Sequence, residues 1–82
     1  MKRLNGTIKG MLSDDYKERF KAEYYQCQIR YKALHKMIIK YEAGTLDFEP
    51  TCPLGLLKEQ AAAMGRYLYT LEIRAQIEDI VL

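Results

Sequence analysis

Apolar and aromatic residues recur along the first half of the chain at alternating steps of four and three. They are Phe20, Tyr24, Cys27, Tyr31, Leu34, Ile38 and Tyr41. This spacing keeps side chains on one face of an α-helix, so it predicts a helix with one buried seam. A second run keeps the same spacing and comprises Leu57, Ala61, Met64, Leu68, Leu71 and Ala75. The pattern therefore predicts two amphipathic helices.

The first helix has recognisable start and stop residues. Ser13 is a candidate N-cap, and a capping box from Asp15 to Glu18 would supply acidic side chains in the first turn. Gly44 is placed to end the helix in a left-handed conformation. We expect this helix over residues 14–43.

The connection GTLDFEPTCP contains both prolines and cannot continue the helix. Pro53 suits the start of a second helix over residues 54–80, with Thr51 or Cys52 as its cap. Gly65 lowers the helix propensity, so we expect it at a point where the two helices approach closely. A short connection makes the helices antiparallel neighbours that pair along their length. The predicted fold is therefore an all-α, antiparallel two-helix hairpin.

Residues 1–12 show no clear period, so we expect a short N-terminal arm ahead of a hairpin domain over residues 13–82. The arm is either a flexible lead or a short extended segment that packs on a neighbour. A chain of 82 residues forms a core that is usually marginal, which favours partners or self-association.

Several apolar residues lie off the two seams. They are Tyr25, Ile29, Met37 and Ile39 in the first helix and Tyr67, Tyr69, Ile73, Ile77, Ile80 and Val81 in the second. Contiguous exposed patches of this size are rare on monomers, so we expect a homo-oligomeric helical bundle. In the alternative arrangement, the N-terminal arm covers part of the patch.

Composition excludes several classes of protein. A net charge of +2 is too small to indicate DNA binding. No apolar run is long enough to span a membrane, and the start lacks the apolar block of a signal peptide, so we expect a cytoplasmic protein. Cys27 in the helix and Cys52 in the connection are too far apart for a disulfide in a hairpin and are expected to be free thiols.

Catalysis has little support. The chain has one histidine, His35, and one serine, Ser13, and it lacks a glycine-rich phosphate loop. A catalytic triad or P-loop therefore cannot be assembled within one subunit. His35 has no second histidine or cysteine pair at ligand spacing, so no metal site or cofactor is expected. Binding is the predicted role.

The candidate ligand contacts come from both helices. Tyr25, Lys32 and Lys36 share one helical face, where an aromatic ring beside two cations can stack a base and hold phosphates. Arg66 and Arg74 are eight residues apart on the second helix, and arginine suits phosphate. The alternatives are that the first group is an ordinary exposed face and that Arg74 pairs with Glu78 four residues later.

Two resemblances extend this interpretation. The segments SDDYKERFKAEYYQCQIRYKALHKMI and CPLGLLKEQAAAMGRYLYTLEIRAQIE resemble short helical proteins of phages and prophages that are related to a protein of a crAss-like phage. The pattern that carries this resemblance comprises Leu56 to Gln60, Ala63, Met64, Tyr67, Leu68, Leu71, Glu72 and Arg74. It implies a viral setting, in which small non-enzymatic proteins often act against host defence.

A looser resemblance is to the helical hairpin of anti-CBASS and anti-Thoeris sponge proteins, whose ending is similar to Leu68, Leu71 and Arg74. It implies an anti-defence protein that oligomerises and buries a cyclic nucleotide signal between subunits in the host cytoplasm. Two alternatives remain open: an anti-CRISPR-like inhibitor that binds a host defence protein, and a structural module without a ligand.

Overall fold

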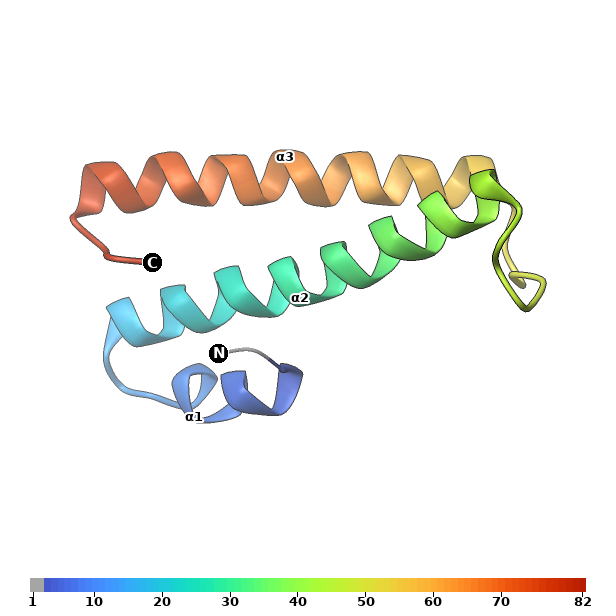
Figure 1. Ribbon diagram of the computed structural model, residues 1–82. Helices are drawn as coiled ribbons and strands as arrows, with labels where there is room; N and C mark the ends of the chain where they lie inside the picture. Colours follow the sequence, from blue (N-terminus) through green and yellow to red (C-terminus); the bar gives the residue numbers. More distant parts are fainter. Residues whose placement is uncertain (1–2) are drawn as a thin grey trace.

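The computed structural model describes residues 3–82, and within this range every regular element is helical. A short 3₁₀ turn, η1 (Leu4–Thr7), leads into α1 (Ile8–Met11), and two long helices follow, α2 (Tyr16–Ala43) and α3 (Leu54–Glu78). The long helices lie one above the other, and the N-terminal segment lies on the opposite side of α2 from α3 (Figure 1). The all-α hairpin is confirmed, with an additional short helix.

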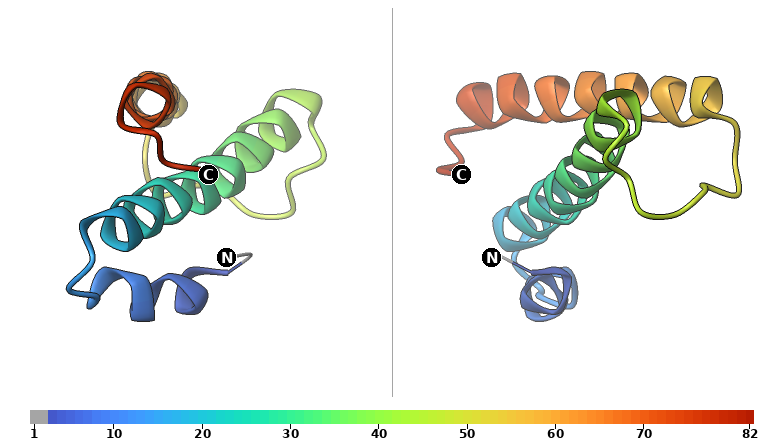
Figure 2. Two further views of the ribbon diagram at one scale, coloured as in Figure 1. Left: turned by 90° about the vertical axis from the view of Figure 1, so that its left-hand side faces the viewer. Right: turned by 45° about the vertical axis from the view of Figure 1, so that its right-hand side comes forward.

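We had expected the two long helices to pair along their whole length, but they do not. Figure 2 shows α2 running obliquely to α3. The main core accordingly lies in the half of the hairpin away from the connection, here called the open end. It consists of Phe20, Tyr24, Leu68, Leu71, Ala75 and Ile80, with Tyr25, Cys27 and Tyr31 packed against it.

Most of the predicted seam is buried or half-buried, and Tyr41 is the main departure. Its side chain is exposed and lines a hollow with Leu46 and Phe48 of the connection. The seam therefore stops contacting α3 before α2 itself ends, because the last turn of α2 faces the connection.

Helix α2 starts slightly later than predicted. Asp15, not Ser13, is its N-cap, and its carboxylate accepts a hydrogen bond from the Lys17 backbone amide (3.0 Å). The Ser13 hydroxyl instead accepts a hydrogen bond from the Asp15 backbone amide (3.0 Å), just before the helix begins. At the other end, Gly44 has φ +75° and closes the helix as predicted.

Helix α3 begins at Leu54, as predicted, but its cap and its C-terminal end differ from the prediction. Neither Thr51 nor Cys52 caps it, because Pro53 occupies the N-cap position without a side-chain bond. The helix ends at Glu78, where Asp79 adopts a left-handed conformation (φ 61°). The Ile80 amide then donates to the Ala75 carbonyl (2.8 Å), and this turn returns the Ile80 side chain to the core. Ile80 is therefore a core residue and not part of a surplus surface.

The N-terminal arm is helical and packs on α2, so the expectation of a flexible or extended lead was wrong. Thr7, Gly10 and Ala22 are all buried, and small side chains permit this close packing. Gln26 of α2 donates a weak hydrogen bond to the Met11 sulfur (3.3 Å). The arm thus covers part of α2.

The remaining local predictions have mixed outcomes. Cys27 is half-buried and Cys52 is exposed, and both are free thiols as predicted. A Cβ atom on Gly65 would lie 3.6 Å from the Tyr31 ring, an ordinary contact, so the helix packing does not require glycine there. Within residues 3–82 no helix is both long and apolar enough to cross a membrane.

Candidate ligand-binding surface

The seam divides the hairpin into two sides. An α-helix turns by about 100° per residue, so the residues before and after a buried position lie on opposite flanks. Arg74 precedes the buried Ala75 and Gln76 follows it; Tyr67 precedes the buried Leu68 and Tyr69 follows it. Arg74 and Tyr69 therefore mark different sides, which we call the Arg74 side and the Tyr69 side.

Side-chain contacts show which flank of α2 belongs to the Tyr69 side. The Tyr24 hydroxyl donates to Glu72 (2.9 Å) and accepts from Gln28 (3.3 Å). Nearer the connection, His35 and Ile39 of α2 line a hollow of about 460 Å³ together with Lys58 of α3. The Tyr69 side thus comprises Gln28, Lys32, His35 and Ile39 of α2, and Lys58, Ala62, Tyr69, Glu72 and Gln76 of α3.

The Arg74 side is closed at the open end by a polar network. Arg74 Nη2 donates to the Tyr16 hydroxyl (2.6 Å), and that hydroxyl donates to Glu78 Oε1 (2.8 Å). Arg74 Nε completes the ring with Glu78 Oε2 (3.1 Å). The guanidinium also lies 5.0 Å from the centre of the Phe20 ring. The network therefore ties the first turn of α2 to the last turn of α3.

Each titratable member of the network is shifted by its neighbours. The hydrogen bond from Tyr16 and the contacts with Arg74 lower the pKa of the Glu78 carboxyl. The bond to Glu78 raises the pKa of Tyr16 and that of Arg74. All three shifts favour a neutral phenol between an ionised carboxylate and a guanidinium, the arrangement that the hydrogen bonds require.

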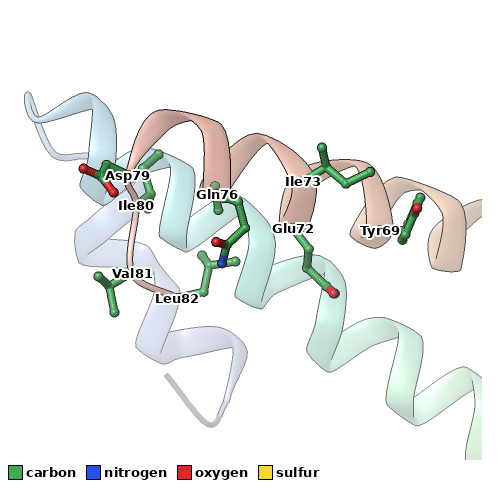
Figure 3. Close-up of a pocket in the computed structure, with 9 residues that line it drawn as sticks. Tyr69, Glu72, Ile73, Gln76, Asp79, Ile80, Val81 and Leu82 are labelled. Atoms are coloured by element: carbon green, nitrogen blue, oxygen red, sulfur yellow. The ribbon is translucent and has the colours of Figure 1, made fainter.

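A hollow of about 610 Å³ lies at the open end of the Tyr69 side. Figure 3 shows its side chains coming from the last turns of α3 and from the tail that follows it. The lining residues are Tyr69, Glu72, Ile73, Ala75, Gln76, Asp79, Ile80, Val81 and Leu82. Two carboxylates stand among apolar walls, and the lining contains no lysine or arginine. This hollow suits a positively charged or amine-bearing group better than a phosphate.

The structure places the three predicted contacts of α2 in two environments. Tyr25 is half-buried, and its ring meets the Tyr24 ring edge-on (centroids 5.1 Å apart), so only part of it is open for stacking. Lys32 and Lys36 are exposed, and neither enters an ion pair within residues 3–82. These two ammonium groups are therefore available to an anion.

The two predicted arginines of α3 do not form one site. Arg66 is exposed near Tyr69, whereas Arg74 lies on the opposite side and is engaged by Glu78 and Tyr16. The intrahelical pairing of Arg74 with Glu78, which we had considered as the alternative, is present. The five predicted contacts therefore do not converge within one copy of the chain.

Sequence reasoning missed the part played by Tyr16. This residue lies four positions before Phe20, so the seam could have been extended one step towards the N-terminus. Its tilted contact with the Phe20 ring (centroids 6.2 Å apart) follows from that spacing, but its bonds across to α3 do not. The Tyr24–Glu72 bond was also missed, because pattern alone gives no register between two helices.

Comparison with known families assigns the chain. The family model described as Sequestin matches residues 14–77, which span α2, the connection and nearly all of α3. The chain belongs to the Sequestin family. Comparisons with curated proteins and with solved structures gave no match. The matched range leaves out η1 and α1, so the hairpin is the part that this member shares with its family.

The family name suggests a sequestering role, the binding of a small ligand or a partner. This agrees with the resemblance to sponge proteins at the level of sequestration. The geometry is compatible with that role, because the two hollows on the Tyr69 side leave room for a ligand. Among residues 3–82, no group of three or more His, Cys, Asp or Glu side chains is arranged to hold a metal ion.

Proposed function

We propose that this member of the Sequestin family binds and sequesters a cyclic nucleotide immune signal, without catalysis, as an anti-defence protein of a phage or prophage. The observation that carries the proposal is the family match over residues 14–77, which covers α2, the connection and nearly all of α3. A sequestering protein needs no reactive group, only a surface complementary to its ligand. Cyclic nucleotides offer two features to such a surface, phosphate charge and flat bases.

The exposed cations of α2 supply the first feature. Lys32 lies on the Tyr69 side and Lys36 lies one turn further along the same helix, and both are exposed. Two ammonium groups one turn apart can hold the oxygens of one or two phosphates. Arg74 lies on the opposite side of the hairpin and is engaged by Glu78 and Tyr16, so its role as a contact remains a prediction.

Aromatic side chains supply the second feature. Tyr69 is 65% exposed on the Tyr69 side, and His35 of the same side lies stacked on Tyr31 (centroids 5.7 Å apart, 9° between planes). A base that stacks on an exposed ring of this kind gains about 1–3 kcal/mol. Tyr25 contributes the part of its ring that Tyr24 leaves open. Because no single hollow contains all these groups, we propose that copies of the chain enclose the ligand between them.

Isothermal titration calorimetry tests the proposal directly. The full chain is titrated with a panel of cyclic dinucleotides, cyclic trinucleotides and cyclic ADP-ribose isomers. We expect saturable binding of at least one member, with the ligand recovered unchanged from the complex by chromatography. An absence of heat with every member would contradict the proposal. If the chain instead co-purified with one host defence protein, the inhibitor hypothesis would replace it.

A further inference from the structure

The hollow of about 460 Å³ on the Tyr69 side lies between α2 and α3, near the connection. Its walls are mainly apolar and come from Ile38, Ile39 and Ala61. Ile38 is buried, whereas Ile39 is exposed. Small-ligand pockets have volumes of roughly 300–1,000 Å³ and combine apolar walls with a few polar groups. This hollow therefore has the size and the lining of a small-ligand site.

An ion pair joins two residues that line this hollow, Lys58 of α3 and Glu42 of α2. Their side chains are 52% and 48% exposed, and an ion pair so open to water contributes little to stability. Among the described residues that line the hollow, Glu42 is the only acid. The pair can therefore open without unfolding the hairpin, and an ammonium group beside an apolar wall then becomes free.

The imidazole ring of His35 lines the same hollow and is held by a neighbour. Tyr31 stacks on it, with 5.7 Å between the ring centroids and 9° between the planes. Ala61 of α3, which also lines the hollow, has a short side chain that leaves the space beside His35 open. Nucleic-acid bases stack on exposed aromatic rings, including imidazole. The hollow thus offers a fixed planar surface to a flat ring.

Further cations stand beside the hollow on α2. Lys32 precedes His35 by three residues and Lys36 precedes Ile39 by three residues, so each lies one helical turn from a lining residue. Both lysines are exposed, and neither enters an ion pair within residues 3–82. Together with Lys58, they bring positive charge to the hollow from both long helices.

We propose that this hollow binds a phosphate of a nucleotide together with the adjoining flat ring, and that Glu42 occupies the phosphate position in the free protein. A phosphate oxygen accepts a hydrogen bond from the Lys58 ammonium group in place of the carboxylate, and the ring stacks on His35 beside Ile39. Hydrogen bonds from lysine to phosphate are charge-assisted and strong, whereas the exposed carboxylate is readily displaced. Lys58 is then a ligand contact, and Glu42 is a competitor of the ligand.

This inference deepens the proposed function and rests on it for the nucleotide class of the ligand. It adds Lys58, which the sequence pattern does not single out, to the candidate contacts. It also gives Glu42 an inhibitory role, because the ligand binds only as its ion pair opens. The hollow at the open end is less suited to phosphate, since its lining includes the carboxylates of Glu72 and Asp79.

Nuclear magnetic resonance of the His35 ring tests the inference, because His35 is the one histidine of the chain and its signals are unambiguous in the untagged protein. Inorganic diphosphate is the first probe, and the panel of cyclic nucleotides follows. We expect saturable shifts of the His35 signals. Lys58→Met should raise the dissociation constant about tenfold, the effect of one lost charged hydrogen bond. Glu42→Gln should lower it about threefold, because the ammonium group loses its competitor.

Matched changes outside the hollow serve as controls. Lys40→Met alters the exposed residue after Ile39, and Glu59→Gln alters the exposed residue after Lys58. A step of about 100° carries both side chains away from the hollow, so both variants should bind as the wild type does. Circular dichroism checks that each variant keeps its helices.

The opposite signs of the two expected effects separate a ligand site from a structural ion pair. If the pair only held the helices together, Lys58→Met and Glu42→Gln would change binding in the same direction, and the inference would be overturned. Unmoved His35 signals with every probe would also overturn it. Binding of diphosphate with the expected opposite effects, but of no nucleotide, would support the phosphate site and refute the proposed function. Nucleotide binding by calorimetry that leaves the His35 signals unchanged would refute only this inference.

Discussion

The hydroxyl of Tyr24 shows how one residue of the seam combines burial with a specific bond. Its side chain is 7% exposed, and the hydroxyl donates to Glu72 while accepting from Gln28. Burial, together with the bond to the carboxylate, raises the pKa of Tyr24 to about 12. The neutral phenol is thus the form that the folded state stabilises.

This shift predicts the response of the protein to alkali. Because the folded pKa lies above the value of 10.0 for a free tyrosine, the contribution of Tyr24 to stability is fully present below pH 10 and is lost as the pH rises through about 12. Tyr24→Phe should lower the free energy of unfolding by about 1 kcal/mol near neutral pH. In a spectrophotometric titration of the phenols, it should also remove a late step near pH 12. Tyr69→Phe, which alters an exposed ring, is the control and should leave that step in place.

At the scale of elements, the polar network on the Arg74 side determines how the open end is held. Tyr16 of α2 bonds to Arg74 and Glu78 of α3, and Lys17 donates to the Asp79 carbonyl (3.3 Å). The connection joins the two helices only at their other end. The network therefore supplies a specific polar link between α2 and α3 where the chain itself does not hold them together.

Acid should weaken this link. The pKa of Glu78 is lowered in the folded state, so its contribution is present above the unfolded value of about 4.3 and is lost as the pH falls through the lower folded value. The urea midpoint of the wild-type chain should fall across that acid range, and Glu78→Gln should flatten the fall. Glu59→Gln, an exposed change on the same helix, should keep the wild-type slope. If both variants matched the wild type, the network would not contribute to stability.

At the scale of the whole molecule, the hairpin presents two sides of different character. The Arg74 side is tied together by its own side chains, whereas the Tyr69 side leaves cations, an aromatic ring and apolar residues open to solvent. The N-terminal segment occupies a third surface, on the face of α2 away from α3 (Figure 1). The ligand is thus expected on the Tyr69 side.

Reversing the charges of Lys32 and Lys36 tests this view. Lys32→Glu combined with Lys36→Glu should weaken nucleotide binding about 100-fold, because each lost charged hydrogen bond is worth about 1.5 kcal/mol or more. Calorimetry with the ligand found in the panel measures the change. Arg3→Glu combined with Lys9→Glu alters the net charge equally but lies in the N-terminal segment, so it should bind as the wild type does. Equal losses in both variants would indicate only a non-specific charge effect.

The two long helices, the glycine that ends the first and most residues of the core can all be predicted from the sequence. These features depend on short-range chemistry, because a step of four and three residues defines a helical face whatever that face contacts. Phe20, Tyr24, Leu68 and Leu71 could all be assigned to the core in this way. The cations could likewise be proposed as ligand contacts from the sequence, but their positions relative to one another could not be predicted.

How the helical faces meet could be seen only in the folded structure. The oblique crossing of α2 and α3, the return of Ile80 to the core and the packing of η1 and α1 on α2 all depend on contacts between residues far apart in the chain. The same contacts placed Arg74 on one side of the hairpin and Lys32 on the other. Helical periodicity gives the angle of each residue about its own axis but not the orientation of one axis relative to another, so the division into two sides could not be read from the sequence.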